Sequence, residues 1–486
     1  MDEHLTLSPE ARAALPASVA AYLAFQDHQI AVLQEQVGSL EGELAKLRLD
    51  LVEAQARSKQ HSGNSSRPPS SDPPDTPARR KPQPSGRKRG GQKGHAGHAR
   101  LQLAPEQITA TVTHRPTQCP SCTLPLESAL PSEGEPVCVQ VWEVPPIVPE
   151  VIEHRGERVR CPHCATLVPA PNLPLSAFGP RLTAIGSVLH GRFRLSMRET
   201  TDVLADLFGV PLGSGSVSSL CQEVNAALTE PYEAVRAHVE VATQVNVDET
   251  GWKQAGEKRW LWVAVTAICT FFMVATNRSA AVLLIMLGDA FDGVVTSDRY
   301  KAYLRIPLAR RQICWAHLKR NLLGFAERNG PVGDWGKEAV GAVEKVFTAW
   351  YRFKGGTTDR AGLQAEMAPL RTHLQTLWAS GEKLPSWMVR GFCHELAKLE
   401  PALWTFVTLD GVEPTNNAAE RSLRPAVLWR KGCFGADSSA GNTFVAKILT
   451  ARATCRQQQR HLLTYLTDAV IAYRDGLPAP SLLPTP

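Results

Sequence analysis

Apolar residues spaced alternately three and four positions apart mark the first long element of the chain. These residues, the heptad seam, are Ile30, Leu33, Val37, Leu40, Leu44, Leu47 and Leu51. Because Glu, Gln, Lys and Arg lie between them, the repeat predicts a coiled coil or helical hairpin within residues 1–60. The repeat covers only about three heptads. Self-association through the seam is therefore favoured over the alternative, an amphipathic helix that packs on its own chain.

From residue 241 onward the pattern becomes that of an α/β domain. Val245 and Val247 alternate with polar residues and predict a half-buried strand that ends at Asp248. Residues 293–297 predict a second strand, which ends at Asp298. Two acids at strand ends are therefore the first candidate site residues.

The segment between these strands is either a membrane span or part of the sheet. Residues 260–276 carry no charge over 17 positions, which is short for a membrane-spanning helix. Their Val, Thr and aromatic residues favour strands, so we expect a buried hairpin of residues 260–266 and 271–276. A helix at 279–290 and a strand at 311–315 would complete a mixed sheet.

Two other segments have the periodicity of helices. Residues 196–224 are typical of a helix, a tight turn at Gly209 and a second helix. This pattern fits either a DNA-binding helix-turn-helix or a plain helical hairpin. Residues 322–411 are helical in pattern throughout, which predicts an all-helical insertion within the α/β domain.

A basic, Gly-rich stretch dominates the charge of the chain. The net charge is +6, yet residues 76–105 alone hold eight Lys and Arg residues and no acid. With few apolar side chains, residues 61–105 cannot bury a core and are expected to form a flexible linker. The run fits either a solvated tether or a phosphate-binding segment, and its setting favours phosphate. Its candidate DNA contacts are Arg87, Lys88, Arg89 and Lys93.

Four of the eleven cysteines form two CPxC pairs, namely Cys119, Cys122, Cys161 and Cys164. The 38 residues between the pairs include strand-like sequence at 137–144. Paired CxxC turns supply four thiolates for tetrahedral Zn²⁺, which predicts a zinc-ribbon-like module. This cysteine usage, with an acidic, polar N-terminus and no signal peptide, fits a reducing cytoplasm better than a disulfide framework.

A third acid follows far downstream of the two strand-terminal aspartates. Spacing of i, i+4 places Asn416, Glu420 and Arg424 on one helical face. Carboxylates that converge from two strands and a helix suit Mg²⁺ or Mn²⁺, which also bind substrate phosphates. Asp248, Asp298 and Glu420 are therefore the candidate catalytic residues and metal ligands of a phosphodiester-cleaving site. Taken singly, each acid is also typical of a helix cap or a solvated face.

Four strings of residues resemble the transposases of the insertion-sequence 66 family. They are Val-Asp-Glu-Thr-Gly-Trp at 247–252, Ser-Asp-Arg-Tyr-Lys-Ala-Tyr at 297–303, Gln-Ile-Cys-Trp-Ala-His-Leu-Lys-Arg at 312–320 and Asn-Asn-Ala-Ala-Glu-Arg-Ser-Leu-Arg-Pro at 416–425. The heptad N-terminus, the basic stretch and the paired CPxC turns also resemble that family, so the resemblance spans nearly the whole chain. Arg299 departs from it, because the family more often has Gly after the second Asp.

The resemblance implies a ribonuclease-H-like fold and a DDE-type DNA transposase. Such an enzyme would cut the ends of its own element at terminal inverted repeats and join the freed 3′-hydroxyls to target DNA, with Mg²⁺ or Mn²⁺ as cofactor. It also implies two small accessory proteins as partners. We expect a homo-oligomer in the cytoplasm, associated with the nucleoid and not with a membrane. The alternatives are a catalytically silent DNA-binding remnant or regulator and a cellular ribonuclease-H-like nuclease.

Further residues are expected to assist this site. Candidate contacts to the phosphates beside the scissile bond are Arg421, Arg424, Arg430 and Lys431. Ion pairing within the core is the alternative for Arg421 and Arg424. Cys314 and His317 form a CxxH pair without further ligands in the sequence, so we expect them, with Asn416, to support the site and not to bind a metal.

These expectations combine into one domain order. It is a helical, coiled-coil region at 1–60, a basic linker at 61–105, a zinc-binding module at 106–175, a helix-turn-helix-like segment at 176–240, a catalytic domain at 241–465 with its helical insertion at 322–411, and a C-terminal tail at 466–486.

Overall fold

The computed structural model describes residues 9–65, 72, 76, 101–174 and 176–484. The chain divides into two compact units, one made of residues 1–76, 154–202 and 212–486 and the other of residues 77–153 and 203–211. The first unit contains a five-stranded sheet and two hydrophobic cores.

The sheet is mixed, which confirms the predicted α/β class. Its strand order is β5-β4-β3-β6-β7, in which β3, β4 and β5 are antiparallel and β6 and β7 run parallel to β3. The strands are β3 (Gln244–Gln254), β4 (Glu257–Val265), β5 (Thr270–Ala275), β6 (Val294–Ser297) and β7 (Arg311–Ile313). The uncharged stretch at 260–276 therefore forms the predicted hairpin, β4 and β5. In the described part of the chain, no helix is long and apolar enough to cross a membrane.

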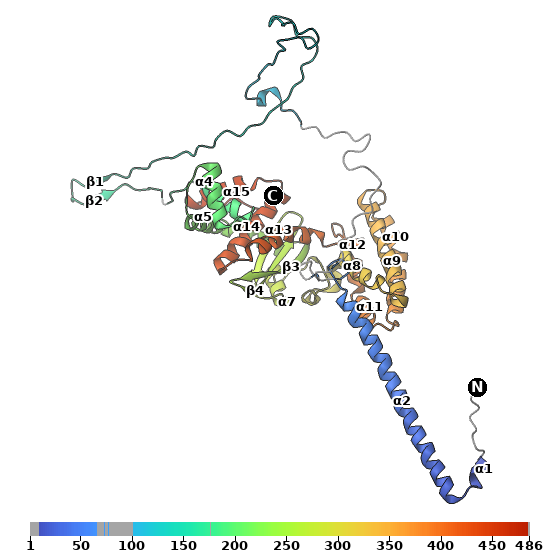
Figure 1. The fold of residues 1–486 in the computed structure, drawn as a ribbon. Coiled ribbons are helices and arrows are strands. Elements are labelled where there is room, and N and C mark those ends of the chain that lie inside the picture. The colour runs from blue at the N-terminus through green and yellow to red at the C-terminus, as the bar shows by residue number, and fades with distance from the viewer. Residues whose placement is uncertain (1–8, 66–71, 73–75, 77–100, 175, 485–486) are drawn as a thin grey trace. The chain divides into compact units, whose positions relative to one another are not determined.

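Helices that precede, separate and follow the strands in the chain share one core with this sheet (Figure 1). They are α3 (Pro180–Gly191), α5 (Ser214–Ala227), α6 (Thr229–Glu240), α7 (Ala280–Leu287), α13 (Asn417–Cys433), α14 (Ser439–Gln457) and α15 (Leu462–Arg474). The segment at 176–240 is helical as predicted, and it also includes α4 (Met197–Phe208). Helix α15 crosses the expected boundary at residue 465, and its buried Leu466 and Val470 place it in the core and not in a tail.

Helix α14 protects the outer edge of the sheet. The hydroxyls of Thr450 and Thr454 accept the backbone N–H groups of Phe272 and Thr270 in the edge strand β5, at 3.0 and 3.1 Å. An edge strand leaves a row of such groups unpaired. These two threonines therefore close one end of the sheet and fix the position of α14.

The predicted helical insertion has a core of its own. Its main helices are α8 (Trp315–Ala326), α9 (Gly330–Lys354), α10 (Arg360–Gly381) and α11 (Trp387–Leu399), followed by the short α12 (Thr405–Thr408). Aromatic residues such as Trp335, Trp378 and Phe392 pack edge to face in this second core. Ile313 of β7 belongs to it as well, so the insertion is packed directly on the sheet.

The N-terminal region is a long helix that is anchored at one end. Helix α2 (Ala17–Ser58) follows the short α1 (Pro9–Ala13) and exposes the heptad seam, with Leu40 63% and Leu47 65% accessible. Near its end, the buried Glu53 pairs with Arg328 at 3.2 Å and accepts a hydrogen bond from Ser386, the N-cap of α11. The structure confirms the helix that the periodicity predicts, whereas self-association stays a prediction.

The region at 101–174 contains little regular structure. It has a 3₁₀ turn at Pro105–Gln107 and a hairpin of β1 (Arg158–Arg160) and β2 (Leu167–Pro169). The strand expected at 137–144 is wrong, since no strand forms there. Val137 and Val141 are 94% and 86% exposed. Without a paired strand or a covering layer, β-branched sequence alone does not produce a strand.

Candidate active site

Strand register brings the two aspartates together. Asn246 of β3 pairs with Thr296 of β6 in parallel register, and Asp248 and Asp298 each lie two residues further along. Parallel strands present residues of equal register side by side at the same edge. Asp248 and Asp298 therefore lie level with each other, as expected. The strand predicted to end at Asp248 is longer than predicted, because β3 pairs with β4 as far as Gln254, whereas Asp298 directly follows β6.

Asn416 connects the third acid to the same strand. This residue, the buried N-cap of α13, does not cap its own helix with its side chain. Its Nδ2 donates to the carbonyl of Val247 at 2.7 Å, and its Oδ1 accepts from Nδ2 of Asn246 at 3.1 Å. Glu420 lies one turn later, and the N-terminus of α13 is therefore fixed on β3 beside Asp248.

The charges of the neighbouring acids act on Asp248. The pKa of Asp248 is raised well above its ordinary value, first by burial and then by the negative charges of Glu249, Asp298 and Glu420. Carboxylates that repel one another in a shielded site are stabilised by a bound cation. Asp248, Asp298 and Glu420 thus have the donor chemistry and mutual repulsion that suit a hard divalent metal ion.

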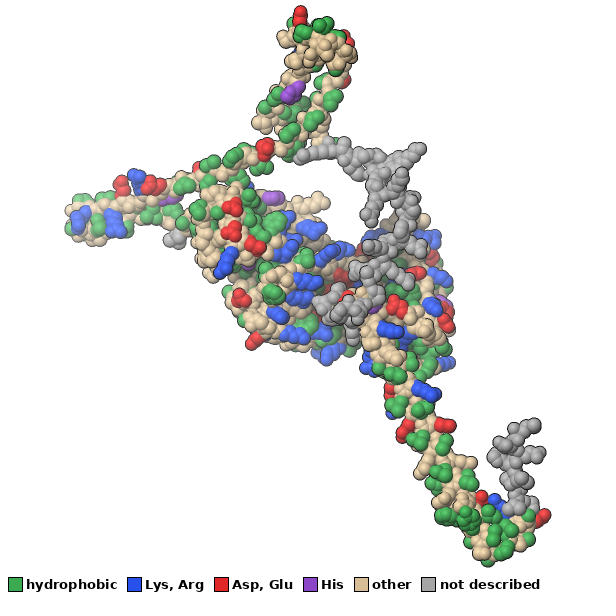
Figure 2. Space-filling model, in the orientation of Figure 1, with side chains coloured by type: hydrophobic (Ala, Val, Ile, Leu, Met, Phe, Trp, Pro, Cys, Tyr) green, Lys and Arg blue, Asp and Glu red, His purple; other side chains and the backbone are tan. Residues whose placement is uncertain are grey.

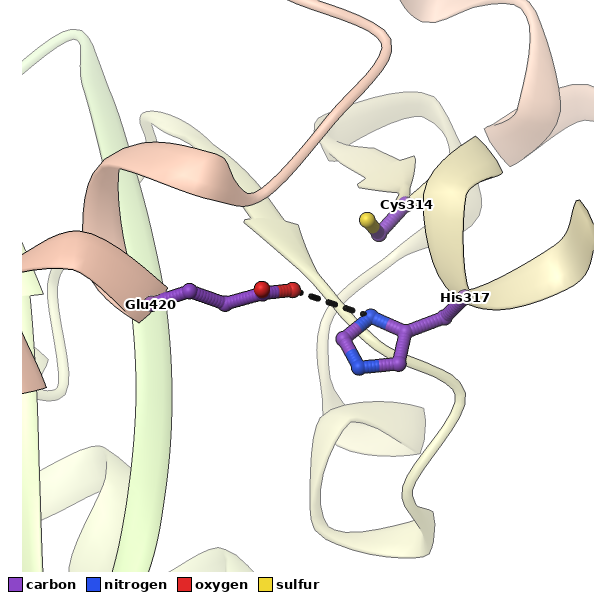
Figure 3. Close-up of side chains that lie close together, drawn as sticks. All are labelled: Cys314, His317 and Glu420. Carbon is purple, nitrogen blue, oxygen red and sulfur yellow. Dashed lines mark ion pairs between the residues drawn. The ribbon is translucent and has the colours of Figure 1, made fainter. Parts of the chain in front are cut away.

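Glu420 also lies near the CxxH pair, and Figure 3 shows the side chains of Glu420 and His317 pointing toward each other. Its Oε1 lies 3.5 Å from Nδ1 of His317. Neither atom has a hydrogen-bond partner among the described residues. Together with Sγ of Cys314 these atoms lie within 4.8 Å of one another. The sequence showed no third ligand for Cys314 and His317, and the structure provides one in Glu420.

The two members of the CxxH pair differ in what they can do. Cys314 is fully buried, and burial raises the pKa of its thiol to about 11. Its Sγ accepts the backbone N–H of Asn416 at 3.2 Å, which ties the start of α8 to the start of α13. Burial lowers the pKa of His317, so its imidazole is neutral near pH 7. In one tautomer Nδ1 carries the proton and can donate to Glu420, and in the other it carries the lone pair that could bind a metal.

Glu249 belongs to a different set of contacts from its neighbour Asp248. Successive residues of a strand point to opposite faces. The carboxylate of Glu249 accepts a hydrogen bond from the hydroxyl of Tyr303 at 2.6 Å and lies 3.6 Å from Arg278. Burial, followed by the charge of Asp298, raises the pKa of Glu249 to about 7. These partners give Glu249 a structural place behind the acids.

Two arginines beside Asp298 have roles that the sequence did not indicate. Arg311 is fully buried in β7, and its Nη2 donates to the backbone carbonyl of Asp298 at 3.0 Å. Arg299 pairs with Glu395 of α11 and donates to Asn321 at 3.1 Å. Glu395 thus balances the extra charge at 299. The neighbours of Arg311 in the chain, Arg310 and Gln312, are also polar, so the sequence carries no signal that this arginine is buried.

The basic residues expected to contact DNA fall into three groups. Arg421, Arg424 and Lys431 are exposed on α13 and form no ion pair with any described residue, so the alternative of core ion pairs for the two arginines is wrong. Arg430 instead donates to Thr250 at 3.2 Å and to the carbonyl of Gly251. A phosphate contact by Arg430 would compete with these acceptors. The linker residues Arg87, Lys88, Arg89 and Lys93 lie outside the described residues.

The two CPxC turns have the same local geometry. In the first, the N–H of Cys119 donates to Leu124 and the N–H of Thr123 returns to Cys119, at 3.0 and 2.9 Å. In the second, the N–H of Cys161 donates to the carbonyl of Thr166 and the N–H of Ala165 donates to the carbonyl of Cys161, at 2.8 and 3.0 Å. Hydrogen bonds lower the pKa of Cys119 and of Cys164, which favours thiolates. The turns fall in separate units, so a shared four-thiolate site stays a prediction.

Comparison with known proteins identifies the family. The model of the "Transposase IS66 family" matches residues 176–443, which is more than half of the chain, and a "Family of unknown function" matches residues 20–101. Two uncharacterized proteins of Sinorhizobium fredii are similar. The protein y4hP is 24% identical over 75% of this chain and 72% of its own length, and y4qI is 26% identical over 39% and 37%. The chain therefore belongs to the IS66 family of transposases.

Proposed function

We propose that this chain is a DDE-type DNA transposase, which cuts the ends of its insertion sequence and transfers the 3′ ends to target DNA. One observation carries the proposal. Asp248 and Asp298 lie level across the parallel strands β3 and β6, and the hydrogen bond from Asn416 to Val247 holds the start of α13, one turn before Glu420, on β3. The strand order, with three antiparallel and two parallel strands, supports a ribonuclease-H-like fold for the domain that holds them.

In this proposal each acid has one task. Asp248 and Asp298 would be ligands of Mg²⁺ or Mn²⁺, and Glu420 would complete the ligand set from α13. When bound, such ions activate a water or a 3′-hydroxyl and stabilise the leaving oxygen of a phosphodiester. Asn416 and Cys314 position the start of α13, and through it Glu420. His317 orients the Glu420 carboxylate, or joins it as a ligand.

Other parts of the chain would serve the DNA. Exposed Arg421, Arg424 and Lys431 lie on the helix that carries Glu420 and are available for phosphates beside the scissile bond. The basic linker and the zinc-binding turns would bind the terminal inverted repeats. The heptad seam would pair two chains, because joining two DNA ends needs both ends in one assembly.

A cleavage assay on the DNA that flanks this reading frame tests the proposal. The parent protein should produce new 3′-hydroxyl ends in Mg²⁺, and Asp298→Asn should lower the rate by roughly a thousandfold or more while it still binds the same DNA. Glu249→Gln is the matched control, since it changes an adjacent acid outside the proposed ligand set. Binding without cleavage by the parent would favour a silent DNA-binding remnant. Preferential cleavage of an RNA–DNA hybrid would favour a cellular nuclease.

A further inference from the structure

A hollow on the face of α13 next to Glu420 collects positive charge. It has a volume of about 340 Å³, and its lining includes Arg421, Arg452 and Arg456 but no acidic residue. Arg421 directly follows Glu420, and one step along a helix turns the side chain by about 100°. The hollow therefore adjoins the acid site on the neighbouring face of the same helix. Figure 2 shows Lys and Arg side chains gathered over α13 and α14.

Arg452 is the least satisfied of these arginines. It is half-buried on α14, and its Nη1 is buried without a hydrogen-bond partner among the described residues. Burial, followed by the charges of Arg192, Arg194 and Arg456, lowers its pKa to about 10. The guanidinium is still charged at pH 7. Arg192, Arg194 and Arg456 therefore repel Arg452, whose Nη1 donor has no acceptor among the described residues.

The surroundings of the hollow are fixed and not adaptable. Thr450 and Thr454 hold α14 on strand β5 through hydrogen bonds of 3.0 and 3.1 Å. Gln457 is occupied as well, because its Nε2 donates to the carbonyl of Thr266 at 2.7 Å. The arginines thus cannot find partners by moving the helix. Repulsion of this kind is relieved when an anion binds between the guanidinium groups, and Arg binds phosphate oxygens in a bidentate manner.

We propose that the hollow lined by Arg421, Arg452 and Arg456 binds a backbone phosphate of DNA, at a point beside the cleaved bond and not at it. The proposal rests on the function proposed above and adds Arg452 and Arg456, with Arg192 and Arg194 nearby, to the DNA-binding surface. Its position next to Glu420 means that this phosphate would set the register of the strand across the acids. Free phosphate has the same oxygen chemistry, and the test separates the two sources.

The test measures binding of a duplex oligonucleotide of random sequence to the full-length protein in EDTA, at 50 and 200 mM salt. The double variant with Arg452→Ala and Arg456→Ala should bind more weakly and depend less on salt. For each duplex phosphate contact that is lost, the drop in affinity between the two salt concentrations should shrink by about 3.5-fold. Arg452→Lys should retain more of the salt dependence than Arg452→Ala. Arg181→Ala, an exposed arginine of α3 outside the hollow, should change neither quantity.

Three other outcomes would each contradict a different part of the proposal. An unchanged salt dependence in the double variant, with a thermal unfolding midpoint like that of the parent, would overturn the proposal. Stabilisation of the parent by inorganic phosphate that the double variant lacks, without any change in DNA binding, would overturn the DNA assignment. If the parent itself did not bind duplex DNA, the proposed transposase function would fail and not merely this site.

Discussion

The sheet that carries the acids and the two CPxC turns both present candidate metal ligands, but they hold them in different ways. In the sheet, the ligands follow strands of fixed register, and Asn416 ties the third element to them by two hydrogen bonds. In the turns, the backbone hydrogen bonds are local, and Cys122 and Cys164 are exposed. The valines between the turns are exposed as well.

The two regions differ in what positions the ligands of each site. The acids are positioned by a packed core before any ion binds, and their repulsion is a cost that the ion removes. The region of the turns buries almost no apolar surface, so a metal would have to supply the free energy that a core supplies elsewhere. Ion removal should therefore loosen the first site slightly and unfold the second.

The largest expected effect is on the CPxC turns. Combining Cys119→Ser with Cys161→Ser should remove zinc, expected at about one ion per chain for four thiolates, and abolish amide protection within residues 106–175. The strands of the sheet should keep theirs, because their core is separate. Hydrogen exchange with metal analysis checks both points. Protected amides at 106–175 in a zinc-free protein would contradict the zinc module.

The heptad seam should give the next largest effect. Replacing Leu40, Leu44 and Leu47 with Asn should reduce self-association, since each leucine would lose about 1.5–3 kcal/mol of burial against a partner helix. Leu49→Asn is the matched control, because Leu49 is exposed on the same helix but lies off the seam. Sedimentation of each variant measures the mass. Identical masses for parent and triple variant would show that the seam does not pair two chains.

Titration of Glu249 should have a smaller effect, in the metal-free protein. Its pKa is raised to about 7 in the folded state, so the folded protein binds this proton more tightly than the unfolded chain does. Stability from this group is complete at low pH and is lost as pH rises to about 7, by up to about 3 kcal/mol. Glu249→Gln should remove that loss, whereas Glu257→Gln, on the exposed end of β4, should not. Urea unfolding at pH 4.5 and pH 8 measures the difference, and equal pH dependence in parent and Glu249→Gln would contradict it.

Local patterns predicted much of this fold because they report local physics. Alternation located β3 and the hairpin, and helical periodicity located α2 and the insertion. The two aspartates are neighbours because each follows an apolar segment of a parallel strand pair, although Asp248 lies within β3 and not at its end as predicted. By contrast, the strand expected at 137–144 failed because strands depend on a partner, which a single segment does not reveal.

Contacts between distant segments could not be predicted from local sequence patterns. His317 and Glu420 meet because Cys314 and Asn416 join two helix starts that lie 102 positions apart. Arg311 supports Asp298 from within β7, next to the buried Gln312 and Ile313. Neither arrangement follows from spacing or composition, since each depends on how the insertion returns the chain to the sheet.

The central claim is that Asp248, Asp298 and Glu420 form one divalent-metal site, and thermal unfolding with and without Mg²⁺ tests it most directly. A ligand that binds only the folded state adds about 2.7 kcal/mol of stability at one hundred times its dissociation constant. The parent should gain that stability from Mg²⁺, whereas Asp248→Asn, Asp298→Asn and Glu420→Gln should each lose most of the gain. Asp248→Asn should also be more stable than the parent in EDTA, because it removes a charge that its neighbours repel. The same Mg²⁺-dependent gain in all four proteins would contradict the account.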